Sequence, residues 1–306
     1  MVFVPYLEAL RITIEHSNRY RYTRPVELTK HRLMLRPAES HGLKILSSSL
    51  DVSGVPQISW EHDIFDNSVA HLNFTAKTDE LTITSRYELE QFNLNPFDFV
   101  MEIYTNDLPF AYQGEDAVDL QPFMQPQYPA DEDAVREWLR PFLDAEGRGK
   151  TLDFLLATNS AIAEQFGYGR REEAGTQSPA ETLRLGTGTC RDFALFLIEI
   201  ARHMGLAARY VSGYLCSSAE DESAPEIADN STHAWTEIYL PGAGWKGFDP
   251  TSGILAAGYH VRVAATRNPD QATPIRGSYL GDGSLFAGME VAIKAVAHPP
   301  SDSPAS

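Results

Sequence analysis

The stretch Gly186-Thr-Gly-Thr-Cys-Arg-Asp-Phe-Ala-Leu-Phe-Leu-Ile198 joins a glycine-containing loop to a long apolar run. Thr189, followed three residues later by Asp192, matches a capping box, so a helix is predicted to begin at Cys190. The apolar residues of this run recur at helical spacing, and Gly205 is suited to end the helix. The cysteine is therefore expected in the first turn of an amphipathic helix.

A sulfur in that position is suited to nucleophilic chemistry. The positive end of the helix dipole favours thiolate over thiol. The free backbone N–H groups of the first turn can also stabilise an oxyanion, each such donor contributing about 3 kcal/mol in other enzymes. The competing interpretation is a small buried core cysteine, which is the common fate of a free thiol. The position of Cys190 after a Gly-x-Gly loop favours the nucleophile.

Two further residues supply a possible base and its orienting group. His233 begins a predicted strand, 232–240, and Asp249 ends another, 245–248, with a short loop between them. If Leu240 paired with Trp245, Asp249 would lie on the face opposite His233. Pairing Tyr239 with Trp245 instead places Asp249 diagonal to His233 on one face. We therefore expect a five-residue loop or a bulge, and a Cys-His-Asp set.

The chain divides into two predicted parts. Alternating apolar and polar residues from about 10 to 94 predict an all-β, sandwich-like domain, and prolines recur between 95 and 129. Helical patterns follow at 131–139 and 151–166, and a strand at 209–215. The expected boundaries are a β-domain with its connecting segment at 1–129, a catalytic core at 130–297 and a disordered tail at 298–306.

Composition narrows the class of protein. The net charge of −17 argues against nucleic acid or an anionic membrane as the main partner, and no apolar run reaches the length of a membrane span. The only cysteines, Cys190 and Cys216, form no zinc-binding pattern. A disulfide between them stays open, but low cysteine usage favours the cytoplasm. Cys216 has no base at useful spacing and is interpreted as a bystander beside an exposed acidic loop, 217–230.

Seven blocks of the sequence together resemble the bacterial transglutaminase-like proteins. Four lie in the second half: Gly186 to Ala194, Ala208 to Tyr214, His233 to Glu237, and Gly244 to Thr251. Three lie in the first half and resemble the β-domain that precedes that core: His16 to Pro25, His31 to Pro37, and Trp60 to Asn67. His260 and Arg267 also align with the family, but the segment from Thr266 to Gln271 differs from the Gly-Arg-Asp-Tyr-x-Asp-type segment that relatives often have there.

The resemblance implies an α+β fold: a papain-like or transglutaminase-like core preceded by an all-β domain. Within it Cys190 is the nucleophile, His233 the base and Asp249 the orienter. Tyr168 and Gln177 are the candidates for a second oxyanion donor. No cofactor or metal is implied.

We expect a cysteine-dependent hydrolase that cleaves amide, peptide or isopeptide bonds of a peptide or protein through a thioester. A protein-glutamine transglutaminase would use the same residues with an amine as the second nucleophile. A catalytically idle binding or scaffold protein with the same core is the third alternative. The oligomeric state stays open.

Overall fold

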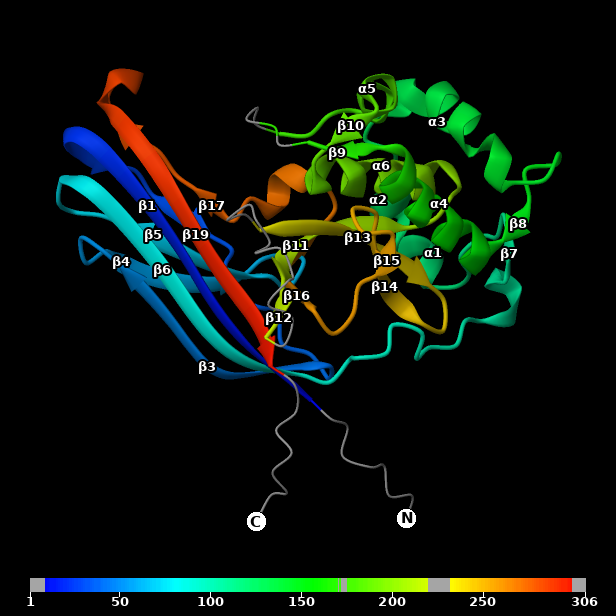
Figure 1. Cartoon of the computed structure of the whole chain (residues 1–306), viewed down its shortest axis with the longest axis horizontal. Coiled ribbons are helices and arrows are strands. Elements are labelled where there is room, and N and C mark those ends of the chain that lie inside the picture. Colours follow the sequence, from blue (N-terminus) through cyan, green and yellow to red (C-terminus); the bar gives the residue numbers. More distant parts are fainter. Residues whose placement is uncertain (1–8, 170, 172–174, 220–231, 299–306) are drawn as a thin grey trace, which may run out of the picture.

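The computed structural model describes residues 9–169, 171, 175–219 and 232–298. It consists of a strongly curved, all-β part and a mixed core of helices and strands, which lie side by side (Figure 1). Residues 299–306 of the expected tail and residues 220–230 of the expected acidic loop lie outside the described residues. The α+β class and the two-part arrangement predicted from the sequence are confirmed.

Two β-sheets form the first part. The larger has the order β12-β19-β1-β6-β3, with β18 also paired to β1, and the smaller has the order β17-β2-β5-β4. The strands of the larger sheet are β1 (Leu10–Leu28), β3 (Leu43–Val52), β6 (Thr78–Gln91), β12 (Ser217–Ser218), β18 (Tyr279–Leu280) and β19 (Phe286–His298). Those of the smaller sheet are β2 (His31–Leu33), β4 (Gln57–His62), β5 (Ser68–Asn73) and β17 (Ile275–Arg276).

Alternation along these strands produces the packing. On β6, Leu81 and Ile83 are fully buried, and they pack with Leu33 of β2 and Leu72 of β5 in one apolar cluster. Side chains of a strand alternate between its two faces, so every second residue can enter the space between the sheets. This cluster makes the β-domain sandwich-like, as expected.

The chain end belongs to the β-domain, which corrects the predicted boundary at residue 297. β19 pairs antiparallel with β1 from Arg11↔His298 to Tyr22↔Phe286, and β17 pairs with β2. Residues 275–297 were assigned to the core and His298 to a disordered tail, but the structure places them in the sheets of the first part (red and blue strands, Figure 1). The boundary was predicted wrongly because the alternation of apolar and polar residues in a strand does not indicate which distant strand it pairs with.

The second part is built on a five-stranded antiparallel sheet of order β15-β14-β13-β11-β16. Its strands are β11 (Ala208–Leu215), β13 (His233–Leu240), β14 (Gly244–Asp249), β15 (Ile254–Leu255) and β16 (His260–Thr266). Its main helices are α3 (Glu132–Leu139), α4 (Thr151–Gln165), α5 (Pro179–Leu185) and α6 (Cys190–His203). The short helices α1 (Asp116–Asp119) and α2 (Gln121–Met124) lie in the connecting segment, which was expected to be extended.

Helix α6 is the centre of this part. Phe193, Phe196, Leu197 and Ile200 are buried in the main apolar cluster, where α6 contacts β13 and β11. The helix begins at Cys190 and ends before Gly205, whose φ of 78° lies in the left-handed region. Both ends match the prediction from the sequence, and the apolar face fixes the orientation of the first turn.

The two parts share a buried contact. Ile12, Ile14 and Leu89 of the larger sheet pack with Tyr214 of β11 and Val261 of β16. His16 of β1 also hydrogen-bonds the Tyr214 hydroxyl at 3.0 Å. The β-domain therefore supports the side of the core sheet that carries β16.

Both cysteines are free thiols, so the disulfide left open by the sequence is not formed. Cys216 is buried in the contact between the two parts, and burial raises the pKa of its thiol to about 12. This environment is that of an inert core cysteine.

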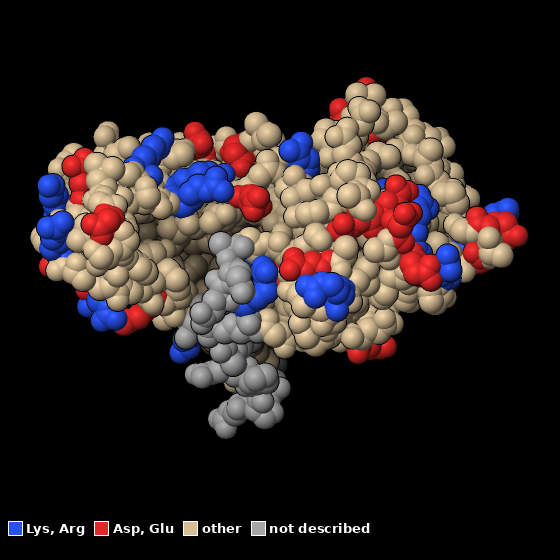
Figure 2. Space-filling model, turned by 90° about the horizontal axis from the view of Figure 1, so that it is seen from above, with Lys and Arg blue, Asp and Glu red and all other residues tan. Residues whose placement is uncertain are grey.

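Among the described helices, none is long and apolar enough to cross a membrane. Lysine and arginine side chains are interspersed with acidic ones over the face shown in Figure 2. That distribution differs from the continuous basic stripe typical of nucleic-acid binding.

Candidate active site

The first turn of α6 is held by a network around one buried carboxylate. Asp192 is fully buried and accepts hydrogen bonds from the backbone N–H of Thr189 at 2.9 Å and from its hydroxyl at 2.8 Å. Its other oxygen, Oδ1, accepts from the Gln177 N–H at 2.7 Å, and Arg171 Nε lies 3.4 Å from Oδ2, the oxygen that binds Thr189. The capping role predicted for Asp192 is confirmed. This network fixes the backbone from which Cys190 projects.

A hairpin of β13 and β14 carries the histidine and the aspartate. Tyr239 pairs with Trp245 and Leu240 with Gly244, and the ladder continues to Thr236↔Phe248. This is the register that the sequence predicted, but the turn has three residues, 241–243, instead of the five expected, because Leu240 also pairs with Gly244. It places Asp249 on the face of His233, and His233 Nε2 lies 2.8 Å from Asp249 Oδ2.

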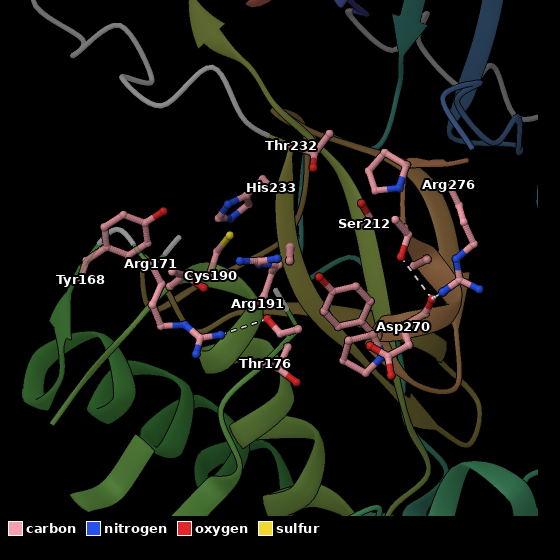
Figure 3. A pocket seen from close by; sticks show the side chains of 18 residues that line it. Tyr168, Arg171, Thr176, Cys190, Arg191, Ser212, Thr232, His233, Asp270 and Arg276 are labelled. Atoms are coloured by element: carbon pink, nitrogen blue, oxygen red, sulfur yellow. Dashed lines mark hydrogen bonds between the residues drawn. The ribbon is translucent and has the colours of Figure 1, made fainter. Parts of the chain in front are cut away.

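The imidazole of His233 connects the sulfur to the carboxylate. His233 hydrogen-bonds both Asp249 and Cys190. Since Nε2 faces Asp249, Nδ1 is the nitrogen available to the sulfur, and Figure 3 shows the ring beside the Cys190 side chain. Burial lowers the pKa of His233, but the hydrogen bonds to Asp249 and Cys190 outweigh burial and raise it to about 10. The ring is therefore held in its protonated form at neutral pH.

The carboxylate of Asp249 is the buried anchor of the site. It has no solvent exposure. Oδ1 accepts from the Thr251 N–H at 3.0 Å, while Oδ2 accepts from the Ser252 hydroxyl at 2.8 Å and from two imidazoles. Burial opposes its charge, but the hydrogen bonds from His233 and His260 lower the pKa of Asp249 far below its usual value. Asp249 is thus a charged, fixed acceptor.

The second imidazole belongs to His260, to which the sequence gave no role. Its Nε2 lies 3.1 Å from Asp249 Oδ2, and its ring packs edge-on against Trp235 at 5.2 Å. His260 starts β16, which pairs with β11 and not with the hairpin, so only the sheet order brings it to Asp249. It contacts the same oxygen of Asp249 as His233 does and so helps to hold the carboxylate in place.

The three residues also have the spacing of a metal site. Ligand atoms of His233, Asp249 and His260 all lie within 4.8 Å of one another. A carboxylate oxygen only accepts hydrogen bonds, so both Nε2 atoms that contact Asp249 carry protons and have no free lone pair there. The three side chains therefore fit two imidazoles that donate hydrogen bonds to one carboxylate better than they fit a metal site.

A cavity of about 600 Å³ lies over the sulfur. Tyr168 lines it, and the parallel pairing of β9 (Gly167–Tyr168) with β10 (Thr187–Gly188) holds it next to the loop before Cys190. Gln177 does not line this cavity. It is buried beside the first turn of α6, where its side-chain oxygen accepts from the Thr182 hydroxyl at 3.1 Å. Of the two candidate oxyanion donors, the structure brings only Tyr168 to the sulfur's side of the helix.

Two regions of the chain match known protein families. Residues 12–90 match the bacterial transglutaminase-like N-terminal region, and residues 144–250 match the core of the transglutaminase-like superfamily. With both regions present in this order, the chain belongs to the transglutaminase-like superfamily, in its bacterial form with the N-terminal β-domain.

Known relatives extend over both parts. An uncharacterized protein of Mycobacterium tuberculosis, Rv2569c, is 28% identical over 286 residues, which are 87% of either chain. YebA of Bacillus subtilis, also uncharacterized, is 34% identical over 72 residues, 22% of this chain and 10% of that protein. A crystal structure from Cytophaga hutchinsonii, of a protein proposed to be a cysteine protease, has a TM-score of 0.69 at 19% identity. It covers 97% of this chain and 93% of its own, which shows that the whole fold is shared.

Proposed function

We propose that the protein is a thiol-dependent acyl-transfer enzyme that hydrolyses amide, peptide or isopeptide bonds through a thioester on Cys190. The observation that carries the proposal is the hydrogen-bonded chain from Cys190 through His233 to the buried Asp249, open to a cavity of about 600 Å³. A protonated imidazole next to a sulfur at a helix N-terminus stabilises a thiolate.

The first half-reaction breaks the C–N bond of the substrate. The Cys190 thiolate attacks the carbonyl carbon, and the oxygen becomes an oxyanion that the free N–H of the first helical turn and Tyr168 can stabilise. The His233 imidazolium gives its proton to the departing amine. The C–N bond then breaks and leaves a thioester, with His233 neutral and Asp249 still charged.

The second half-reaction restores the enzyme. Neutral His233 takes a proton from water, and the resulting hydroxide attacks the thioester carbonyl. Collapse of the tetrahedral intermediate breaks the C–S bond and releases the carboxylic product. The thiolate and the imidazolium are then regenerated together. An amine in place of water would give transglutamination with the same residues.

The scaffold alternative is disfavoured by the same geometry. A protein that only binds through this fold does not need a buried carboxylate with four donors beside a histidine and a cysteine. The free thiols support the cytoplasmic location expected from the sequence. Recovery of the native protein outside the cytoplasm on cell fractionation would contradict that location.

The test uses a library of glutamine-containing peptides, incubated with and without a small primary amine. Hydrolysis predicts free ammonia or new carboxyl and amino termini without added amine, and transfer predicts products that contain the amine. Cys190→Ala is the control and should show no turnover with an unchanged fold. Turnover near the wild-type rate in that variant would refute the proposed nucleophile.

A further inference from the structure

The charged side chains that line the cavity indicate which substrates it binds. The Cys-His-Asp arrangement explains the reaction but does not specify the substrate. Three arginines line the cavity, Arg171, Arg191 and Arg276, and the single acidic residue among its described lining residues is Asp270. The whole chain has the opposite balance, with a net charge of −17. A basic cavity in an acidic protein concentrates anionic ligands at one place.

Two of these arginines have partners. Arg171 lies 3.4 Å from the buried carboxylate of Asp192 and donates to the Gly175 carbonyl at 3.0 Å. Arg276 donates to the backbone carbonyl of Asp270 at 3.0 Å (Figure 3). Both side chains therefore have structural contacts that explain their orientation.

Arg191 differs from the other two. It is the second residue of α6, directly after Cys190, and it is half-buried. Its charge acts on the nearby Tyr210 hydroxyl, and no carboxylate in the described residues forms an ion pair with it. In Figure 3 its side chain and that of Cys190 point to the same cavity. A half-buried guanidinium with no counter-charge is a strong binding site for a carboxylate, which it can bind through two parallel hydrogen bonds.

We propose that Arg191 binds a carboxylate of the acyl donor, so that the enzyme prefers substrates with an acidic group next to the bond that Cys190 attacks. The inference rests on the proposed function, because it assumes that Cys190 is the nucleophile. The adjacency of the two residues fixes where the carboxylate must be: within the same cavity and one side chain away from the reacting carbonyl. Arg191 is thus a specificity-determining residue.

Two alkylating reagents of similar size test this without knowledge of the natural substrate. Iodoacetate carries a carboxylate and iodoacetamide carries a neutral amide in its place. Both transfer their carbon to a thiolate with release of iodide. The readout is the ratio of their second-order rate constants at Cys190, divided by the same ratio for N-acetylcysteine. This ratio cancels any change in the fraction of thiolate.

For the wild type we expect the normalised ratio to exceed one by roughly tenfold or more, since charged clefts raise the encounter rates of opposite charges by about 10 to 10³. Raising the salt concentration should lower the ratio towards one. Arg191→Gln should reduce the ratio about tenfold, and Arg191→Lys, which keeps the charge without the fork, should retain an intermediate value. Arg148→Gln, an exposed arginine outside the cavity, is the matched control and should leave the ratio unchanged.

The outcomes separate the inference from the function on which it rests. An unchanged ratio in Arg191→Gln, with Cys190 still alkylated, would overturn the carboxylate site and leave the nucleophile intact. Failure of both reagents to label wild-type Cys190 would overturn the nucleophile and the carboxylate site together. Circular dichroism and the urea midpoint of each variant exclude misfolding as the cause of a change, and Arg191→Lys provides a second variant if Arg191→Gln does not fold.

Discussion

Replacement of Asp249 by asparagine removes the charge opposite His233 while keeping the size of the side chain. Burial lowers the pKa of His233, yet the hydrogen bonds to Asp249 and Cys190 raise it from 6.5 to about 10. At about 1.36 kcal/mol per pKa unit, the rise corresponds to about 5 kcal/mol. Because burial opposes the protonated ring, loss of the Asp249 charge should return the pKa of His233 to about 6.5 or below, which removes most of this stabilisation of the imidazolium.

The assay is the rate of alkylation by iodoacetamide at pH 7.5. At this pH an imidazole with a pKa of about 6.5 is mostly neutral, and an ordinary cysteine with a pKa of about 8.5 is only roughly 10% ionised. Loss of the imidazolium that stabilises the thiolate therefore predicts a fall of about tenfold at pH 7.5. The difference should shrink as the pH rises towards 9, where an ordinary cysteine is mostly ionised by itself.

Asp133→Asn is the matched control, because Asp133 is an exposed carboxylate in the first turn of α3. Its alkylation rate should equal that of the wild type. A rate at pH 7.5 within twofold of the wild type in Asp249→Asn would refute the argument that Asp249 keeps His233 protonated. A fall of equal size at pH 9 would also contradict it.

Three further predictions concern stability, each measured by urea unfolding. His260→Phe removes one hydrogen-bond donor from the buried Asp249 and should lower the unfolding free energy by about 2 kcal/mol. His260→Gln should recover part of this loss. An unchanged unfolding free energy in His260→Phe would contradict the prediction. Glu199→Gln leaves the fully buried Arg202 without its counter-charge and should cost about 3 to 5 kcal/mol, whereas less than 1 kcal/mol would contradict the ion pair. The pKa of His233 is raised on folding from 6.5 to about 10, so its contribution is complete below pH 6.5 and is lost as the pH rises through 10. His233→Gln should abolish that part of the decline in stability, and an identical decline would argue against it.

The sequence predicted those features of the structure that depend on residues close together in the chain. The capping pair Thr189 and Asp192 determines where α6 begins, and the residues around Cys190 therefore carry their own structural signal. The register of the hairpin could be derived because only one pairing of Tyr239 places Asp249 on the face of His233. In both cases the interacting residues are close in sequence.

Features that depend on distant pairing were missed. His260 reaches Asp249 because β16 pairs with β11, and nothing near His260 in the sequence indicates which strand it will join. β19 pairs with β1 at the opposite end of the chain, and no local pattern indicates this pairing. The predicted boundary of the core at residue 297 was therefore wrong. Gln177 was a candidate for the cavity, but its backbone N–H binds Asp192 and its side chain does not line the cavity.

The central claim is that Cys190 is a thiolate activated by His233, and peptide mapping after iodoacetamide treatment at pH 6 tests it most directly. The account predicts stoichiometric modification of Cys190 in the wild type, none at Cys216, whose pKa burial raises to about 12, and strongly reduced modification of Cys190 in His233→Ala. Equal labelling of Cys190 in the wild type and in His233→Ala, or no labelling of Cys190 in the wild type, would contradict it.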